Sequence, residues 1–386
     1  MHPLSSPLPA HKPQQGSPMA LHRKVAVIGS AIGAPLVRPD RSLEELIYEA
    51  TQKALADAGF DMAAIDGIVV AANDQLDGRA ISVMMASGSV GGVDRDILST
   101  PSAGEHAFVM GALRVASGQY RTQLVVAWSP VEAHSIPEVE RLAADPYFHR
   151  RLPQDDLASY ALQATALAGK VEGVHELARS LAALRPAATA GSESTPGRWP
   201  LTAEMVAPPA TGVVAIVLAD EDFVAEHAIA QPAWVRGMGW ATEPGFLGDR
   251  DLAGAPALEA ATGQAYAEAA IDDPGPAFDV AEIDDRTPYQ ELLVLEGLGL
   301  SSRQDWQKDV AAGAFAPGGR LPVNPSGGTR AANAIYCTGL MRIAEAAAQI
   351  RGKAANQIIG ARTALAHAAS GAAMQYQTVI VLGQDR

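Results

Sequence analysis

Short runs of aliphatic and β-branched residues alternate with longer stretches of helical periodicity in the first part of the chain. The predicted strands are residues 25–30, 65–71, a short run near Ile97 and 123–128, and the predicted helices are residues 42–59, 81–87 and 103–117. Ser42 and Glu45 have the spacing of a capping box at the start of the first helix. Strands separated by helices predict an α/β layered fold with a mainly parallel sheet.

Residues 129–209 break this alternation. They contain helical stretches at 157–172 and 174–184, followed by a run at 189–199 that is rich in Ser, Thr, Gly and Pro. Such a segment is typical of an inserted cap or loop domain. After it, residues 212–220 restore a long apolar strand.

The second half repeats the same order of elements. Its predicted strands are residues 234–242 and 280–285, and its predicted helices are residues 258–270 and 288–299. Both halves also finish with a helix, a glycine, a polar turn and a strand, which indicates internal duplication and places ligand chemistry where the halves meet. The predicted domains are a flexible tail at 1–22, an N-terminal half at 23–230 with the insert at about 129–209, and a C-terminal half at 231–386.

Composition limits the classes of function. The chain has 386 residues, of which 48% are hydrophobic and 19% charged, enough for one large or two fused compact domains. Its formal net charge of −14 disfavours nucleic acid and anionic membranes as partners. The only cysteine is Cys337, which excludes an internal disulfide and a Cys-based zinc site and fits a cytoplasmic protein. No apolar run approaches the roughly 20 residues of a membrane helix, and no metal site is expected.

The duplicated pattern, with the segments LPVNPSGG, EAAAQIRG, TALAH and VIVLG late in the chain, resembles the thiolase superfamily. The resemblance covers residues 24–383 and is most specific to the sterol-carrier-protein-x-type thiolases and the thiolase-fold steroid side-chain aldolases. It implies a duplicated α-β-α-β-α fold with an inserted cap or loop domain. It also implies an acyl-CoA substrate, in which coenzyme A is part of the thioester and no cofactor is tightly bound.

Thiolase chemistry uses a cysteine thiolate at a helix N-terminus, and here the matching position is Pro101. Ser102 is the nearest hydroxyl, and it either forms a capping box with Glu105 or acts as a nucleophile. Cys337 is either a displaced nucleophile or a small buried hydrophobic residue. The sequence thus contains no clear equivalent of the family's acylated residue.

The position of the family's central histidine matches Asp284, beside Asp285. These carboxylates either supply a general base or cap the helix that starts near Pro288. In the third family loop Tyr336 matches a tyrosine of the thiolase-like aldolases, whose phenol oxygen takes the β-hydroxyl proton as the carbon–carbon bond breaks. The second tyrosine of those aldolases falls at Asp284, and Tyr289, about one helical turn further on, either substitutes for it or packs in the core.

The family's late cysteine is also replaced, in a segment that retains His367 and Ser370. His367 is either catalytic or a satisfied core histidine. The amides of Gly327-Gly328 and Ser370-Gly371 are candidates for holding a thioester or enolate oxygen. In the insert, His149, Arg150 and Arg151 either contact the phosphates of coenzyme A or form a solvated surface run.

Two functions remain open at this point. The first is a retro-aldol carbon–carbon lyase acting on a 3-hydroxyacyl-CoA in lipid, steroid or aromatic degradation, with Asp284 or Tyr336 as the base. The alternative is a non-catalytic thiolase-like subunit that binds acyl-CoA or completes a heteromeric thiolase or acyltransferase. The resemblance further implies a homodimer and a partner protein with a zinc ribbon and an OB-fold.

Overall fold

The computed structural model describes residues 23–33, 35, 40–101, 103–152, 154–184, 200–202 and 205–385. The predicted tail, Ser102 and the polar run at residues 189–199 lie outside these described residues.

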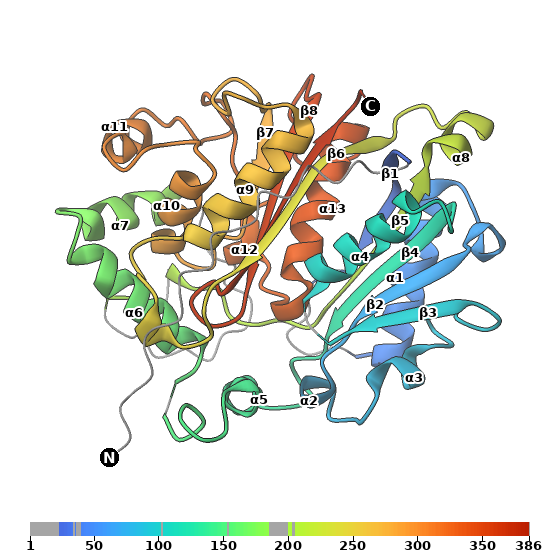
Figure 1. The fold of residues 1–386 in the computed structure, drawn as a ribbon, viewed down its shortest axis with the longest axis horizontal. Helices are drawn as coiled ribbons and strands as arrows, with labels where there is room; N and C mark the ends of the chain where they lie inside the picture. Colours follow the sequence, from blue (N-terminus) through green and yellow to red (C-terminus); the bar gives the residue numbers. More distant parts are fainter. Residues whose placement is uncertain are drawn as a thin grey trace, which may run out of the picture.

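Nine strands form one sheet in this part of the chain, in the order β3-β2-β4-β5-β1-β6-β9-β8-β7 (Figure 1). The strands are β1 (Val25–Ile32), β2 (Gly67–Ala71), β3 (Asp96–Thr100), β4 (Thr122–Ser129), β5 (Gly212–Asp220), β6 (Ala233–Thr242), β7 (Val280–Glu282), β8 (Thr363–Ser370) and β9 (Tyr376–Gly383). Every strand predicted from an apolar run is present, and the one predicted at residues 280–285 ends early, at Glu282.

The two halves of the sheet repeat one pairing scheme. In the first half β1 pairs with β5, β5 with β4, β4 with β2, and β2 with β3. In the second half β6 pairs with β9, β9 with β8, and β8 with β7. In the second half, a parallel bridge between Ala281 of β7 and Val323 corresponds to the β2–β3 pairing of the first half. Matching pairs run in the same direction, so the structure contains an internal duplication.

The prediction of a mainly parallel sheet is wrong, because five of the eight strand pairings are antiparallel. In each half one strand reverses the direction: β5 between β1 and β4, and β9 between β6 and β8. β9 follows β8 after a short turn, and a hairpin makes its two strands antiparallel. Strands that are buried on both faces are near-continuous apolar runs, so their hydrophobic pattern does not predict whether they pair in parallel or antiparallel.

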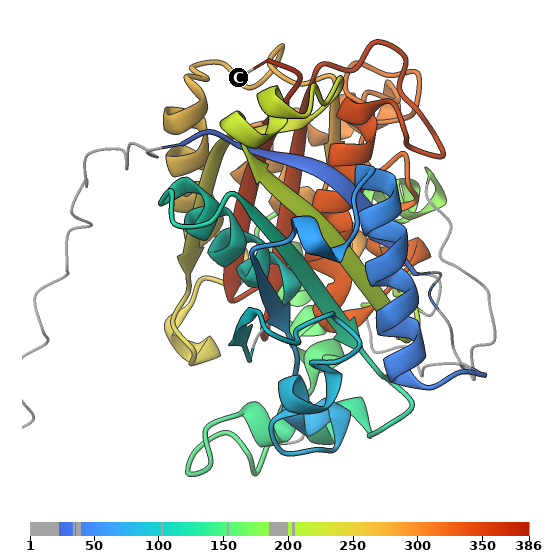
Figure 2. The same ribbon diagram turned by 90° about the vertical axis from the view of Figure 1, so that its right-hand side faces the viewer.

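Helices form three layers around the two half-sheets (Figures 1 and 2). α1 (Leu43–Ala58) packs on the outer face of the first half. α4 (Gly104–Ala116) and α13 (Thr338–Arg351) lie between the halves and share one core with strands of both. α9 (Pro256–Ala269) and α10 (Pro288–Gly297) pack against the second half. The result is the predicted α-β-α-β-α layering.

The insert follows β4 and precedes β5. Its described helices are α5 (Ile136–Ala143), α6 (Asp156–Ala168) and α7 (Val174–Leu184). α6 and α7 pack against α10 through a separate hydrophobic cluster that includes Leu181 and Leu292. The remaining helices are α2 (Asp74–Asp77), α3 (Ser82–Ala86), α8 (Glu221–Glu226), α11 (Trp306–Ala311) and α12 (Gly328–Ala331), and the 3-10 turns are η1 (Met62–Ala64), η3 (Leu247–Asp249) and η4 (Ile335–Cys337).

The capping box predicted at the start of α1 is confirmed. The Glu45 backbone N–H donates to Ser42 Oγ at 3.2 Å, and the Ser42 backbone N–H donates to Glu45 Oε2 at 2.9 Å. Two of the amide groups that have no intrahelical partner are thereby satisfied.

A buried ion pair joins the second half-sheet to the middle layer. Arg342 of α13 donates to Glu282 of β7 at 2.6 Å and to Ser326 Oγ at 2.7 Å. The two charged side chains are 1% and 0% exposed. Burial raises the pKa of Glu282 to about 7 even with the Arg342 charge beside it. Removing one partner of such a pair therefore leaves a polar group in the core without compensation.

We predict that Arg342→Ala lowers the free energy of unfolding by about 3–5 kcal/mol at pH 8, measured by urea denaturation. The loss should be smaller at pH 5, because Glu282 is then protonated in the wild type and the charge pair no longer contributes. The control is Arg362→Ala, which removes an exposed ion pair with Asp385 and should cost less than about 1 kcal/mol. Equal losses for the two variants would contradict the prediction.

Candidate active site

A cavity of about 750 Å³ opens where the insert meets the ends of the layered core. Such a volume is within the usual range for small-molecule sites. Its polar lining residues include Glu140, His149, Asp155, Asp156, Arg286, Tyr336, Ser370 and Tyr376, and its apolar lining includes Pro101, Leu152, Leu162, Phe246, Leu247 and Ile335. Segments from both halves and from the insert therefore meet in one site.

The N-terminal end of α4 faces this cavity through Pro101 and Ala103. Ala103 is the N-cap of α4 and forms no side-chain cap hydrogen bond. Neither carboxylate oxygen of Glu105 has a hydrogen-bond partner among the described residues, and the predicted capping box with Ser102 lies outside them. Proline has no group that can accept an acyl chain, so Pro101 presents no nucleophile to the cavity.

Close packing of the two middle-layer helices brings Tyr336 to the same place. A Cβ added at Gly104 would lie 2.8 Å from the Cβ of Leu340 and 3.4 Å from the carbonyl oxygen of Tyr336, so only glycine fits there. The Tyr336 backbone N–H donates to Ser129 Oγ at 3.1 Å, which anchors η4 to the end of β4.

The phenol of Tyr336 is half-buried on the cavity wall. Burial, and then the nearby charges of Asp156 and Glu140, raise the pKa of Tyr336 above its ordinary value. Within the described part of the chain its hydroxyl forms no hydrogen bond. The hydroxyl is therefore protonated at neutral pH and is available to donate to a ligand.

Arg286 connects three segments around the cavity. Its Nε donates to Asp284 at 3.2 Å, its Nη1 donates to the Tyr160 hydroxyl at 3.0 Å, and its Nη2 donates to the Ala369 carbonyl at 3.2 Å. Its Nη1 also lies 3.5 Å from the Asp156 carboxylate. The guanidinium thus links the loop after β7, strand β8 and helix α6, and its remaining face lines the cavity.

Two carboxyl groups of the insert lie side by side next to Arg286. The Asp156 backbone N–H donates to Glu140 Oε2 at 2.9 Å, and the Tyr160 hydroxyl donates to Asp156 Oδ2 at 2.9 Å. Burial, and then the negative charge of Asp156, raise the pKa of Glu140 to about 9. Glu140 is therefore a protonated acid at neutral pH, next to a carboxylate that is paired with Arg286.

Asp284 and Asp285 lie behind the cavity wall. Asp284 is 3% exposed and is covered by Arg286, and Asp285 Oδ1 accepts the Thr329 backbone N–H at 2.6 Å. Neither residue caps α10, as one interpretation of the sequence had it, because the N-cap is Thr287, whose hydroxyl accepts the Gln290 N–H. Asp284 therefore reaches the cavity only through Arg286.

Two other predicted catalytic residues do not line the cavity. The Tyr289 hydroxyl lies 2.8 Å from His175 Nδ1, and the ring packs in the core between α7 and α10. His367 is fully buried in β8, with its Nε2 2.8 Å from Gln377 Oε1. Burial lowers the pKa of His367.

The two predicted glycine loops differ in position. The Gly327 and Gly328 amides donate to the Asn324 carbonyl at 2.9 Å and to Ser326 Oγ at 3.3 Å, and neither glycine lines the cavity. Ser370 and Gly371 do line it. Ser370 is 8% exposed, and within the described residues its hydroxyl has no hydrogen-bond partner.

The basic run in the insert does not form one cluster. His149 lines the cavity and stacks on Phe246, with ring centroids 4.7 Å apart. Arg150 turns away and donates to the carbonyls of Leu142 and Ala144 near the end of α5. Arg151 is exposed and does not line the cavity.

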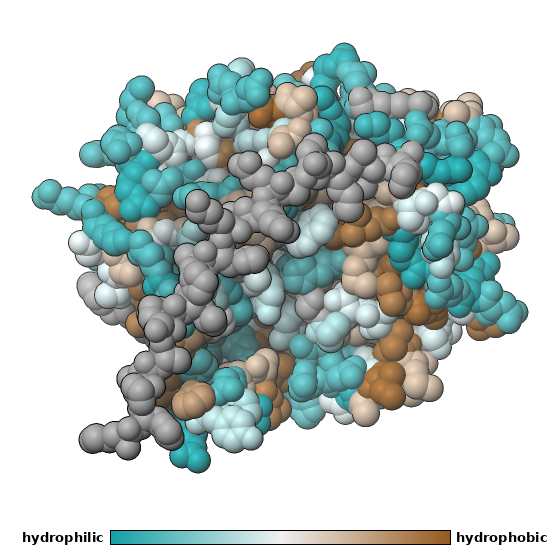
Figure 3. Space-filling model, in the orientation of Figure 1, coloured by the Kyte–Doolittle hydropathy of each residue, from teal (hydrophilic) through white to brown (hydrophobic). Residues whose placement is uncertain are grey.

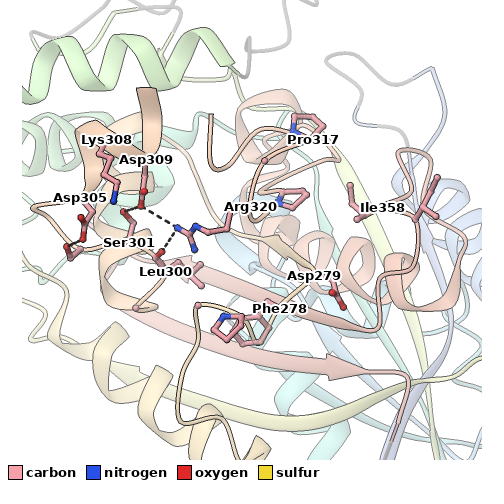
Figure 4. A pocket seen from close by; sticks show the side chains of 18 residues that line it. Phe278, Asp279, Leu300, Ser301, Asp305, Lys308, Asp309, Pro317, Arg320 and Ile358 are labelled. Atoms are coloured by element: carbon pink, nitrogen blue, oxygen red, sulfur yellow. Dashed lines mark hydrogen bonds and ion pairs between the residues drawn. The ribbon is translucent and has the colours of Figure 1, made fainter. Parts of the chain in front are cut away.

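A second, more open hollow of about 1060 Å³ lies beyond the second half-sheet (Figure 4). Arg320 spans it and donates to the Leu300 carbonyl at 3.2 Å and to Asp309 at 3.3 Å, while Ser301 donates to Asp309 at 2.7 Å. These contacts are internal to the hollow, and none of the predicted site residues lines it. The cavity at Tyr336 is therefore the candidate active site.

Among the residues that the structure describes, no helix is both long and apolar enough to span a bilayer. The same residues contain no group of three or more His, Cys, Asp or Glu side chains suited to holding a metal ion.

Comparison with known proteins shows similarity to thiolases over part of the chain. Residues 242–384 match the model of the family described as thiolase C-terminal domain-like. The benzoylsuccinyl-CoA thiolase subunit BbsB of Thauera aromatica is 30% identical over 154 residues, which are 39% of this chain and 39% of that protein. The 17-hydroxy-3-oxo-4-pregnene-20-carboxyl-CoA lyase of Mycobacterium tuberculosis is 36% identical over 88 residues, 23% of this chain and 22% of the lyase. The chain therefore aligns with less than half the length of these two relatives.

The similarity in structure extends over nearly the whole chain. The solved structure described as Ltp2-ChsH2(DUF35) aldolase matches with a TM-score of 0.76 and 22% identity, over 95% of this chain and 99% of that chain. The chain has the thiolase fold, which confirms its predicted fold class, and its residues 242–384 resemble the thiolase family.

Sequence reasoning missed four polar residues of the site: Glu140, Asp156, Tyr160 and Arg286. Three of them belong to the insert, where no periodicity or motif marks a residue that turns toward the core. Arg286 is one residue from the Asp284-Asp285 pair, and a cation beside two buried carboxylates was the available signal.

The burial of Cys337 also predicts that its thiol is unreactive in the native chain. Cys337 is fully buried, and burial raises the pKa of its thiol to about 12. We expect the native chain at pH 7.5 to resist N-ethylmaleimide, because only the thiolate reacts at a useful rate, and to take up one equivalent once unfolded in urea. Intact-mass spectrometry reads both states, and rapid labelling of the native chain would contradict the assignment of Cys337 to the core.

Proposed function

We propose that the protein is a thiolase-fold lyase that cleaves a carbon–carbon bond of a 3-hydroxyacyl-CoA by a retro-aldol reaction. The observation that carries the proposal is the composition of the cavity. Pro101 lines the cavity where the N-terminal end of α4 faces it. Tyr336, Arg286 and the carboxyl groups of the insert line the same cavity. Such a site can move protons, and Pro101 cannot be acylated. Similarity to a steroid-CoA lyase and to the fold of an aldolase supports the same reaction class.

The proposed reaction uses the thioester as the electron sink. Removal of the β-hydroxyl proton lets that oxygen form a carbonyl, the α–β carbon bond breaks, and its electron pair enters the thioester enolate. The Tyr336 hydroxyl binds the β-oxygen, and Ser370 Oγ with the Gly371 amide binds the enolate oxygen. Asp284 supports Arg286 from behind instead of touching the substrate, and His367 supports β8 from within the core.

The acyl group and the coenzyme A arm of the substrate would contact different parts of the cavity lining. We propose that the acyl group contacts the apolar side chains Leu152, Leu162 and Ile335. The coenzyme A arm leaves past His149 and Phe246, whose stacked rings provide an aromatic surface for the adenine. Arg151, at the exposed end of the basic run, is positioned for the phosphates.

The proposal predicts that Tyr336→Phe lowers kcat for 3-hydroxyacyl-CoA cleavage by about 10²–10⁴-fold, because the hydroxyl that binds the β-oxygen during proton transfer is lost. Substrate binding, measured by calorimetry, should change less than threefold. Tyr289→Phe is the matched control, since Tyr289 lies outside the cavity and its rate should stay within about threefold of wild type.

Product analysis separates the lyase from its alternative. A lyase releases an aldehyde or ketone and a shortened acyl-CoA and leaves the protein mass unchanged. An acyl adduct on the protein would contradict it, and so would equal rates for the two tyrosine variants. Binding of acyl-CoA without turnover, alone and with an OB-fold partner, would favour the alternative of a non-catalytic subunit, which the missing nucleophile also suits.

We further propose that the chain forms a homodimer through strand β3. This strand ends the sheet, so its outer backbone edge has no neighbour among the described residues. Apolar side chains gather around it, and Figure 3 shows brown atoms over this part of the molecule. They are Ile81 (54% exposed), Met84 (68%), Met85 (59%), Val93 (69%) and Leu98 (37%). An open edge with apolar neighbours favours pairing with a second copy.

The dimer is tested by Leu98→Asp, which places a charge on the β3 edge. We expect light scattering to give a dimer for wild type and a monomer for the variant, with helix and strand content unchanged in circular dichroism. Tyr147→Asp, at a site 79% exposed on the insert, is the control and should remain dimeric. A monomeric wild type would exclude this interface.

A further inference from the structure

We propose that Glu140 and Asp156, both in the insert, form a carboxyl–carboxylate pair that removes the β-hydroxyl proton of the substrate and returns a proton to the enolate carbon. This inference rests on the proposed lyase reaction and names its acid and its base. Neither residue belongs to the layered core that holds the other predicted catalytic positions.

The geometry brings the two groups together at the cavity wall. α5 supplies Glu140 and the first residue of α6 supplies Asp156, and the Asp156 N–H to Glu140 Oε2 hydrogen bond of 2.9 Å joins them. Both residues line the cavity together with Tyr336. The charges of both act on the Tyr336 phenol, which indicates that the pair and the phenol are near neighbours.

Asp156 is held in place by two partners from other directions. The Tyr160 hydroxyl donates to its Oδ2 at 2.9 Å, and Arg286 Nη1 lies 3.5 Å from the same oxygen. Arg286 is fixed in turn by Asp284 and by the Ala369 carbonyl. These contacts orient the Asp156 carboxylate toward a ligand in the cavity.

A second, independent feature indicates that a ligand occupies this space. Ser370 lines the cavity and is 8% exposed, and within the described residues its hydroxyl has no hydrogen-bond partner. A buried hydroxyl without a partner is costly, and a substrate oxygen would satisfy it. The carboxyl pair therefore lies beside a space in which the Ser370 hydroxyl has no hydrogen-bond partner among the described residues.

The pair balances the protons of the reaction without a co-reactant. At the start Glu140 carries the shared proton and Asp156 is a carboxylate. Asp156 takes the β-hydroxyl proton, directly or through Tyr336, as the carbon–carbon bond breaks and the carbonyl product forms. Glu140 then protonates the enolate carbon to give the shortened acyl-CoA. The pair ends with one proton, now on Asp156, which returns to Glu140 through the contact between the two carboxyl groups.

The charges around Glu140 support this division of roles. Asp155 and Asp156 of α6 are negative neighbours, and burial together with Asp156 raises the pKa of Glu140 to about 9. The other titratable or charged groups that line the cavity are Asp145, His149, Arg286, Tyr336 and Tyr376. A carboxylic acid that keeps its proton at pH 7 can act as a general acid there. Because Glu140 loses this proton above about pH 9, we predict that kcat falls there.

The experiment uses the full chain, with its partner protein if turnover requires one. Wild type, Glu140→Gln, Asp156→Asn and the control Glu138→Gln, on an exposed position of α5, are compared on a 3-hydroxyacyl-CoA panel from pH 6 to 10. We expect kcat to fall about 10²–10⁴-fold in the first two variants, with KM within about threefold, and to be unchanged in the control. Turnover in D₂O should place one deuterium on the α-carbon of the acyl-CoA product.

An activity-independent measurement accompanies the kinetics. Infrared spectra of the resting protein should contain a carboxylic-acid C=O band that titrates near pH 9, is absent from Glu140→Gln and persists in Glu138→Gln. Wild-type turnover with an undiminished Glu140→Gln rate, or without this band, would overturn the pair and leave the lyase standing. A wild type that binds the thioesters and cleaves none would overturn both the lyase and the pair.

Discussion

Contact between the two helices of the middle layer determines where the site lies. α4 and α13 are buried between the two half-sheets, and Gly104 lets the N-terminal end of α4 approach Leu340 and the backbone of Tyr336. The duplicated halves each contribute one of these helices, so the duplication makes their ends meet. Everything that follows in the site, including the exposure of Pro101 and the position of the Tyr336 phenol, depends on that contact.

Arg286 then couples the core to the insert. A guanidinium with little exposure is tolerated only when charges and carbonyls surround it, and Asp284, Asp156, Tyr160 and Ala369 provide them. The arrangement covers Asp284 with a cation, and Asp284 does not line the cavity. Glu140 and Asp156 of the insert line the cavity together with Arg286. Under the proposed function, a thiolase-like fold would perform acid–base chemistry through carboxyl and phenol groups.

Three of the candidate residues lie away from the cavity: Cys337 and His367 are fully buried, and Tyr289 packs between helices. Tyr336 and Ser370 are different, because both residues line the cavity. The distinction depends on which face of a strand or helix meets an open space. A local pattern of residues specifies the element and one apolar face, and it does not specify the neighbours of the other face.

The sequence by itself determined the elements, the duplication and the resemblance to thiolases, because apolar periodicity, the Ser42 capping box and the late glycine motifs are local signals that each residue carries with it. It also singled out Tyr336, which lines the cavity in the structure. Only the tertiary structure decided the strand directions, since a buried apolar run looks the same in the sequence whether the strand pairs in parallel or antiparallel. It alone also brought Asp156 and Tyr160 against Arg286, because such contacts join segments more than 100 residues apart and depend on how the insert folds back over the core.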